Sequence, residues 1–451
     1  MSTFSGINLA SRALSAANKS VTLTGQNIAN VNTEGYSRQR VEQVAMDSVS
    51  SGVFSGRNNP GNGVEVTDIS RATDAFVDAR QRGDHSAAAY ATQVDATYVD
   101  AEKLLNEPSD QSLTIQLQDF WGAWKDLAND TGDAASQEQV LNTGKAVATT
   151  LNTLDSRLSQ QWSNLKDNAE TLVADVNNTA TKVADLNLAI RKAQANDQNA
   201  NELMDQRDQQ ILKLSDLVDV STSRNSDGTY DVSVGGSTLV HGTDTVKVKL
   251  AAPSSLQDAR TGDKARLVLD LGGATAPVGI VSGQLAAHLD SLNTVLPDIA
   301  KEFDAVAAKV ATSVNGIYGT DASGQTFFSG TTARTLVVDR TDATTIQGSS
   351  SGKNADRAGE LGKMAEAVGS PDTLWRSKVT DIGNKAAAAT AKAGIAQTTA
   401  ANSDASRESV SGVSIDEEMV NLVTYQHAYS SAAKVFTAMD DMIQTILNMV
   451  R

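Results

Sequence analysis

The strongest constraint on how this chain folds is a hydrophobic seam present at both of its ends. Between Ile415 and Val450 the seam follows alternating steps of four and three residues, the spacing of a coiled coil. Its positions are Ile415, Met419, Leu422, Gln426, Tyr429, Ala433, Phe436, Asp440, Ile443, Leu447 and Val450. Gln426 and Asp440 interrupt the apolar pattern, and Met439 and Met442 are expected to carry the stripe past Asp440. The pattern predicts one amphipathic C-terminal helix.

Capping residues define the start of this helix. Ser414 can accept a hydrogen bond at the N-cap while Glu417 reaches back, an arrangement known as a capping box. Asp416, Glu417 and Glu418 then place negative charge at the positive end of the helix dipole. Neighbouring side chains diverge on a helix, so we attribute these acids to capping rather than to general acid–base catalysis.

The N-terminal segment carries a seam with the same spacing. Its positions are Ile7, Ala10, Leu14, Ala17, Val21, Thr24, Ile28 and Val31. Each seam needs a partner, and the simplest partner is the other end of the chain. Small residues such as Ala10 and Ala17 bury little area, so a pair of these helices alone is marginally stable. We hypothesise that the pair completes its core against neighbouring copies. The alternative is a C-terminal helix that folds onto its own domain.

Composition excludes several classes of function. The chain has 451 residues and a formal charge of 38 − 54 = −16, without a Lys/Arg-rich run, which argues against nucleic acid as a partner. It contains no cysteine, so no thiol nucleophile is available. The first residues lack a basic region and an unbroken apolar run, and Arg12 and Lys19 interrupt the next stretch of the chain. We therefore expect neither a Sec-type signal nor membrane insertion.

The interior of the chain is predicted to be mostly helical. From about Ala134 to Ala195 there is no proline, and a seam from Val147 through Leu158 and Trp162 to Ile190 predicts one very long helix. In its second half we assign the seam to Ala169, Leu172, Val176, Thr179, Val183, Leu186 and Ile190. Short strands are predicted at 41–49, 63–69, 336–339 and 344–346, and five more between 220 and 271.

These patterns predict a mainly α, nested, multidomain chain with a small β insertion. Residues 1–45 and 405–451 would form a terminal coiled-coil domain. Residues 46–218 and 283–404 would form a long-helix bundle as the body, and residues 219–282 a small outer β domain. Trp121 and Trp124 are expected in the body core.

No catalytic, cofactor or metal site is predicted. The four histidines, His85, His241, His288 and His427, form no close metal-binding pattern. Gly61 and Gly63 lie in a loop, but Val66 stands where a dinucleotide-binding motif needs its third glycine. The chain is therefore predicted not to be an enzyme.

Several segments, taken together, resemble the flagellar axial proteins. The stretch from Asn27 to Tyr36 (NIANVNTEGY) is similar to the N-terminal motif of rod, hook and hook-associated proteins. Further segments are similar to the FlgK family of hook-associated proteins: 37–39 (SRQ), 120–128 (FWGAWKDLA), 201–208 (NELMDQRD), 227–230 (DGTY) and 411–418 (SGVSIDEE), with Asn421, Leu422, Tyr425 and Gln426. The chain is short for this family, which implies a reduced outer domain.

This resemblance implies a structural subunit at the junction between hook and filament, outside the bacterial cell. It implies export by the flagellar type III system and assembly into a ring of copies. Expected partners are the hook protein, the second hook–filament junction protein and an export chaperone that holds the C-terminal helix.

The residues expected at the assembly interface come from both ends of the chain. They are Ile7, Leu14, Val21, Asn27, Ile28, Asn30, Val31, Tyr36, Arg38, Gln39, Met419, Leu422, Tyr425, Gln426, Tyr429, Phe436, Ile443, Leu447 and Val450. The chaperone is expected to bind Leu422, Tyr429, Phe436, Ile443 and Leu447.

Alternatives stay open at this point. Asn27 and Asn30 fit simple helix termination as well as a contact role, and Tyr36, Arg38 and Gln39 fit a solvated strand edge equally well. The chain is also compatible with a hook, rod or filament subunit of the same superfamily. A different class is an extracellular hydrolase or adhesin on a helical stalk.

Overall fold

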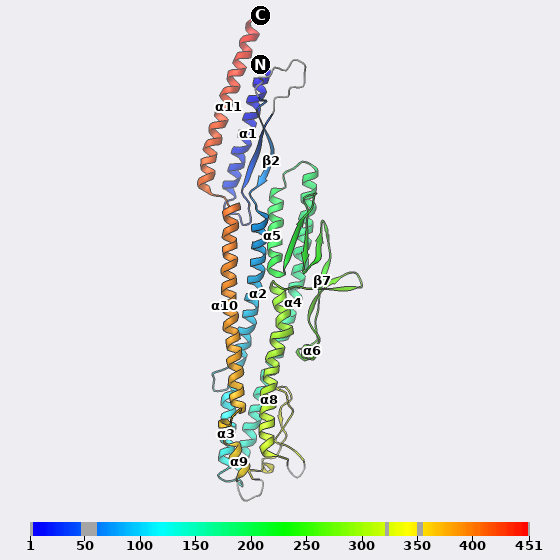
Figure 1. The fold of residues 1–451 in the computed structure, drawn as a ribbon, viewed down its shortest axis with the longest axis vertical. Helices are drawn as coiled ribbons and strands as arrows, with labels where there is room; N and C mark the ends of the chain where they lie inside the picture. The colour runs from blue at the N-terminus through cyan, green and yellow to red at the C-terminus, as the bar shows by residue number, and fades with distance from the viewer. Residues whose placement is uncertain (1–2, 47–60, 321–323, 350–354, 450–451) are drawn as a thin grey trace.

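The computed structural model describes residues 3–46, 61–320, 324–349 and 355–449. Figure 1 shows an elongated molecule with the two terminal helices at one end, a long helical body, and a small β module on the side of the body. The fold is mainly α with a small β insertion, as predicted.

One end of the molecule consists of the two terminal helices and a β-hairpin. Helix α1 (Thr3–Ala29) packs against α11 (Ile415–Met449), although the two are at opposite ends of the sequence. Strands β1 (Gln39–Ala45) and β2 (Val64–Arg71) pair antiparallel beside α1. The predicted strand positions 47–49 lie outside the described residues. We call residues 3–46, 61–71 and 412–449 the terminal unit.

Helices form the body, which we define as residues 75–218 and 283–411. They are α2 (Ala75–Leu105), α3 (Leu113–Leu127), α4 (Ala134–Ala195), α5 (Asn201–Leu217), α7 (Gln284–Asp290), α8 (Leu296–Tyr318), α9 (Asp356–Leu361) and α10 (Pro371–Ser411). A π-helical turn, Ser291–Val295, joins α7 to α8. The long predicted helix is confirmed as α4, and Asp133 caps its start by accepting from the Ser136 backbone N–H at 2.9 Å.

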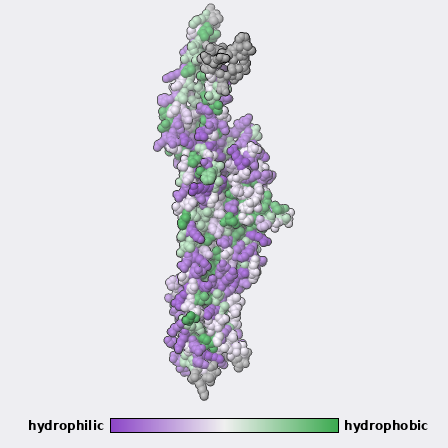
Figure 2. Space-filling model, viewed as in Figure 1, coloured by the Kyte–Doolittle hydropathy of each residue, from purple (hydrophilic) through white to green (hydrophobic). Residues whose placement is uncertain are grey.

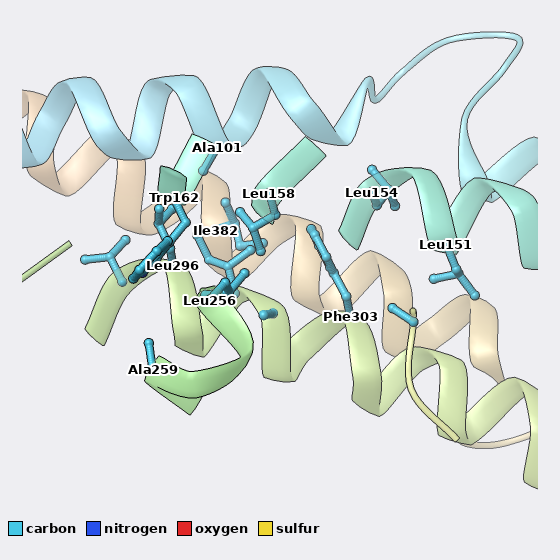
Figure 3. Packing of buried hydrophobic residues seen from close by; sticks show 14 of the residues in the cluster. Ala101, Leu151, Leu154, Leu158, Trp162, Leu256, Ala259, Leu296, Phe303 and Ile382 are labelled. Carbon is cyan, nitrogen blue, oxygen red and sulfur yellow. The ribbon is translucent and has the colours of Figure 1, made fainter. Parts of the chain in front are cut away.

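The body has one continuous apolar core. Figure 3 shows Trp162 of α4, Leu296 of α8 and Ile382 of α10 directed into the same interior, and all three are buried. At the far end, Trp124 lies 5.4 Å from Phe327, measured between ring centroids. Trp121 is also buried, so the prediction that both tryptophans of this segment are core residues is confirmed.

The predicted seam of α4 needs one correction in its second half. The buried positions there are Val173, Ala180 and Asn187, each one residue after the predicted Leu172, Thr179 and Leu186. Asn187 is buried because its amide group donates to the carbonyls of Tyr230 and Gly242, at 2.8 and 2.6 Å. This polar anchor for the β module has no signature in an apolar pattern.

The β module contains two antiparallel sheets. The first pairs β3 (Val220–Arg224), β4 (Tyr230–Val234), β5 (Ser237–His241) and β6 (Asp244–Thr245) in sequence order, and the second pairs β7 (Lys247–Ala251), β8 (Arg266–Asp270) and β9 (Thr275–Val278). The five predicted strands of the module are confirmed, whereas β6, β9 and the short helix α6 (Leu256–Thr261) were not expected.

Short elements complete the far end of the body. Strands β10 (Phe328–Ser329) and β11 (Val337–Val338) pair antiparallel, and Met364–Glu366 forms a 3-10 turn before α10. The strand predicted at 344–346 is wrong. Ala343–Thr345 form a 3-10 turn because Asp342 accepts from the Thr344 backbone N–H at 2.9 Å, which caps the turn.

Candidate assembly interface

Helix α1 presents only part of the predicted seam to its neighbours, because Ala16, Ser20 and Leu23, each one residue before a predicted position, are buried as well. Ala10, Ala17 and Thr24 are buried, and the larger seam residues around them are half-buried. Those larger residues are Ile7, Leu14, Val21, Ile28 and Val31. The small residues therefore occupy the centre of the contact face, which limits the area that this pair buries.

Helix α11 meets α1 with a face that keeps part of the predicted seam and is shifted by one position elsewhere. Eight positions of α11 are buried or half-buried: Glu418, Asn421, Leu422, Tyr425, Ala432, Ala433, Met439 and Ile443. Leu422, Ala433 and Ile443 belong to the predicted seam. The predicted Met419, Gln426, Asp440 and Leu447 are exposed instead. Met439 carries the apolar face past Asp440, as predicted, because it packs on Gly6, whose missing side chain leaves room for the methionine sulfur. Met442, also expected there, is exposed.

The rest of α11 exposes many large apolar side chains. They are Ile415, Met419, Val420, Val423, Tyr429, Val435, Phe436, Met442, Ile446, Leu447 and Met449. Figure 2 shows hydrophobic residues along the terminal helices in this view. Val450 lies outside the described residues. An apolar surface of this kind on a helix marks an interaction site.

Below the terminal helices, Asn27 is the centre of a buried polar network. Its amide nitrogen donates to the Gln39 carbonyl at 2.8 Å and to Glu418 Oε2 at 3.0 Å. Its amide oxygen accepts from the Tyr36 hydroxyl at 2.8 Å and from the Gln39 backbone N–H at 3.1 Å. The side chain is 2% exposed and makes all four hydrogen bonds available to an amide. Asn27 thereby joins the end of α1, the start of β1 and the start of α11.

Arg38 strengthens the same connection. Its guanidinium lies 2.8 Å from Glu417 Oε2 and 2.7 Å from Glu418 Oε1, and its backbone N–H donates to the Ser411 carbonyl at 2.8 Å. The predicted capping box is therefore half right. Ser414 accepts from the Glu417 backbone N–H at 3.5 Å, but the Glu417 carboxylate turns to Arg38.

The other asparagine of the motif acts differently. The Asn30 amide donates to the Gln26 carbonyl of its own helix at 3.0 Å, which is helix termination. Tyr36, Arg38 and Gln39 all hydrogen-bond across segments, so the solvated-edge interpretation of these residues is wrong. Burial, followed by the nearby Asp205 charge, raises the pKa of Tyr36 to about 12, so its hydroxyl stays a donor.

The first turns of α5 connect this network to the body. Glu202 accepts from the Gln26 amide at 2.6 Å, and Asp205 accepts from the Ser37 backbone N–H at 3.0 Å. Asn201 donates to Gln39 Oε1 at 3.1 Å. We call Asn201, Glu202 and Asp205 the α5 turn.

Arg71 at the end of β2 pairs with the same helix. It lies 2.7 Å from Asp205 and 2.9 Å from Asp208. Burial raises the pKa of Asp205, and the hydrogen bonds from Ser37 and Arg71 oppose that shift.

Sequence reasoning missed the residues that complete the network. Glu418, Arg71 and the α5 turn were not predicted as site residues. The sequence held one sign of the role of Glu418. It lies one heptad before Tyr425, which was predicted at the interface, so the two side chains share a face of the helix. For the α5 turn, the only sign was that its segment belonged to the family-like motif 201–208.

Near this network, His85 holds three helices of the body together. From α2, its Nδ1 lies 3.1 Å from Asp216 of α5 and its Nε2 lies 2.8 Å from Asp404 of α10. The hydrogen bond to Asp216, followed by the bond and charge of Asp404, raises the pKa of His85 to about 9. The ring is therefore charged at neutral pH and donates to both carboxylates.

Two cavities flank the network. One of about 370 Å³ is lined by residues 30–36 together with α2, α5 and the end of α10. The other, of about 580 Å³, lies between β2, the start of α2, the end of α4 and α5. Within the described ranges, no cluster of three or more His, Asp or Glu side chains has a metal-binding arrangement. None of the described helices combines the length and apolar character needed to cross a membrane.

Comparisons with known proteins match both the body and the C-terminal end. Residues 99–328 match the family model of the flagellar hook-associated protein FlgK helical domain. Residues 406–449 match the model of the flagellar basal body rod FlgEFG protein C-terminal region.

Individual relatives agree with these models. The chain is 28% identical to flagellar hook-associated protein 1 of Bacillus subtilis over 99% of this chain and 98% of that protein. It is 30% identical to flagellar hook-associated protein 1 of Escherichia coli, but over 56% of this chain and 46% of that protein. The solved flagellar hook junction protein FlgK from Burkholderia pseudomallei has a similar fold, with a TM-score of 0.50 at 20% identity, over 56% of this chain and 46% of that one.

Proposed function

This chain belongs to the FlgK family of flagellar hook-associated proteins, and on that premise we propose that its paired terminal helices are the surface through which copies assemble. It is a structural component of the hook–filament junction of the bacterial flagellum. The match of the body to the FlgK helical domain separates it from hook and rod subunits, which share the C-terminal region.

The proposal rests on one observation: α11 packs on α1 with one face and leaves its other apolar side chains exposed. Glu418 is its one buried residue among those described, while large apolar side chains such as Val420 and Leu447 are 67% and 63% exposed. Water contact with this much apolar surface is unfavourable, so the helix is stabilised when neighbours cover it. The helices of adjacent copies in a ring, and of the subunits above and below, are suitable covers.

The interface comprises the residues predicted from both ends of the chain, with separate roles. Met419, Tyr429, Phe436 and Leu447 face outward on α11 and would contact other subunits. The half-buried residues would hold α1 and α11 together, and Asn27, Tyr36, Arg38 and Gln39 would fix the base of the pair.

The partners follow from the same surface. Hook protein and the second junction protein would lie on the two sides of the ring. Before assembly, an export chaperone would cover Leu422, Tyr429, Phe436, Ile443 and Leu447, because an uncovered apolar helix invites premature association. The protein would leave the cell through the flagellar type III system. Its role would be structural rather than catalytic.

We propose the three-part division into terminal unit, body and outer β module for this assembly. Helix α10 continues past residue 405 to Ser411, so the boundary of the terminal unit is best set at 412. Residues 61–71, first assigned to the body, are placed in the terminal unit because β2 pairs with β1. The β module, residues 219–282, lies on the side of the body away from α10 in Figure 1 and would face outward.

Leu447→Asp tests this proposal. Leu447 is 63% exposed, so the monomer should fold normally while the covered interface would contain a buried charge. In a strain that lacks its own copy, we expect loss of motility, with the variant released into the medium instead of located at the hook tip. Ile395→Asp, on the body helix α10 with 69% exposure, is the matched control and should leave motility intact. Normal swimming with Leu447→Asp would contradict the proposal.

A further inference from the structure

The outer β module is attached to the body partly by apolar side chains. Val240, Val248 and Leu267 of the module are buried in the same core cluster as the body helices. Apolar contact is non-directional, so it holds the module to the body without fixing where each strand lies. In β7, for example, Val248 and Leu250 lie on the same face, so a slip of the sheet by two residues would keep an apolar side chain toward the body.

Polar contacts of a second kind fix the second sheet to the body, and asparagine side chains make them. Asn177 of α4 donates to the Val248 carbonyl and accepts from the Val248 backbone N–H, both at 2.9 Å. Asn293, in the π-helical turn, binds both backbone groups of Ala265, each at 2.7 Å. An asparagine amide presents a donor and an acceptor side by side, so one side chain can pair with one residue of a strand as a neighbouring strand does.

Asn187, also on α4, binds the first sheet in the same way. Its amide nitrogen donates to the carbonyls of Tyr230 and Gly242 at 2.8 and 2.6 Å, and its oxygen accepts from the Tyr230 backbone N–H at 3.1 Å. Arg207 of α5 supports the same strand, because its guanidinium lies 3.7 Å from the centroid of the Tyr230 ring. Asparagines of the body therefore reach β4, β7 and the residue before β8, which includes both sheets of the module.

The same pairing occurs where other strands meet helices. Asn27 binds both backbone groups of Gln39 at the start of β1. Asn315 of α8 binds those of Phe328 in β10, at 2.8 and 2.9 Å. The recurrence indicates that helix asparagines are a general means by which this fold places its strands.

We propose that Asn177, Asn187 and Asn293 are positioning residues that set the register of the outer β module on the body. The apolar core supplies the adhesion, and the asparagines select one placement among those that apolar packing permits. Because they bind backbone groups, the placement does not depend on the exposed side chains of the module, such as Lys249 and Arg266. This is a property of a single copy and goes beyond the proposed function.

Spin-label distances in the full-length chain test this placement. The chain has no cysteine, so Lys182→Cys on α4 and Thr275→Cys on β9, both exposed positions, provide the two label sites. We expect one narrow distance population for the labelled parent chain. Asn177→Leu with Asn293→Leu removes the hydrogen bonds to Val248 and Ala265 and should produce a broad or displaced population, while the helix content stays unchanged.

A single isosteric variant separates placement from folding. Asn177→Asp keeps the oxygen that accepts from the Val248 N–H but turns a second oxygen toward the Val248 carbonyl, so one hydrogen bond is lost. Hydrogen exchange of β7 should become about tenfold faster, with the exchange of β4 and of the body helices unchanged. Asn178→Leu, at the next position of α4, which is exposed, is the matched control and should change neither measurement.

An unchanged narrow population in the double leucine variant would overturn the proposal, as would unchanged exchange of β7 in Asn177→Asp or a broad population in the labelled parent chain. Fast exchange throughout both sheets of the double variant would also overturn it, because the asparagines would then maintain the fold of the module rather than its placement. If the double variant fails to fold, the exchange of Asn177→Asp decides alone. None of these measurements needs assembly, so their failure is separate from a failure of the junction proposal.

Discussion

Helices α4 and α11 follow the same heptad spacing, yet the structure uses them in opposite ways. Helix α4 has 62 residues, and its seam is buried along its length by α3, α5, α8 and the β module. Helix α11 has 35 residues, packs on α1, and buries a single described residue, Glu418. A heptad pattern therefore predicts that a helix has an apolar face. It does not predict whether that apolar face is covered by other helices of the same copy or only by a second copy of the chain.

The largest expected difference comes from the same truncation in the two helices. Leu151→Ala in α4 removes a side chain with 0% exposure and should cost about 2–5 kcal/mol of unfolding free energy. Leu447→Ala in α11 should change the unfolding free energy of the monomer by less than about 0.5 kcal/mol. Denaturant unfolding of the purified monomer measures both. Equal costs would mean that α11 is already packed in a single copy.

The network around Asn27 should show an intermediate effect. Asn27→Ala leaves the Gln39 N–H and the Glu418 carboxylate without their buried partner, a loss of about 1–3 kcal/mol. The loss should appear as faster hydrogen exchange in α1 and the start of α11, with the amides of α4 unaffected. Asn30→Ala is the matched control, since its amide makes only local hydrogen bonds, donating to the Gln26 carbonyl and accepting from the Thr33 hydroxyl. Faster exchange throughout the body after Asn27→Ala would show that the two units unfold together.

Two glycines sharpen the comparison at atomic scale. An added Cβ at Gly144 of α4 would lie 2.9 Å from a ring carbon of Phe327, while one at Gly6 of α1 would lie 2.9 Å from the Met439 sulfur. The aromatic core is closely packed, so Gly144→Ala should lower the unfolding free energy of the body by about 1–3 kcal/mol. Met439 is flexible and lies on a largely exposed helix. Gly6→Ala should therefore leave the stability of α1 unchanged or raise it by up to about 1 kcal/mol, because alanine has the higher helix propensity. Thermal unfolding and α1 exchange rates distinguish these outcomes, and a destabilising Gly6→Ala would indicate a rigid terminal pair.

The smallest expected effect is the pH dependence of the stability of the body. The folded pKa of His85, about 9, is above the ordinary value of 6.5, so its stabilisation is complete below pH 6.5 and is lost as the pH rises toward 9. Burial lowers the pKa of His288, so that residue should destabilise the body as the pH falls below 6.5. The melting temperature of His85→Asn should lack the alkaline decline and keep the acidic one. An unchanged alkaline decline would show that His85 does not stabilise the body.

Much of the fold was predictable because it depends on local periodicity. The bounds of α4, the five predicted strands of the module and the helical character of both ends follow from residues a few positions apart, which share a face of a helix or strand. The contact face of α11 was predicted only in part: Leu422, Ala433 and Ile443 of the seam are half-buried, as is Met439, while other seam positions such as Leu447 are exposed.

By itself, the sequence determined where helices and strands form and that the two ends carry apolar faces that need partners. Only the tertiary structure decided that Asn27, Glu418 and the α5 turn meet, since hydrogen bonds between residues hundreds of positions apart leave no periodic trace in the chain. It also decided which apolar residues remain uncovered. Exposure depends on everything that packs around a side chain, and on α11 a single copy supplies too little to cover it.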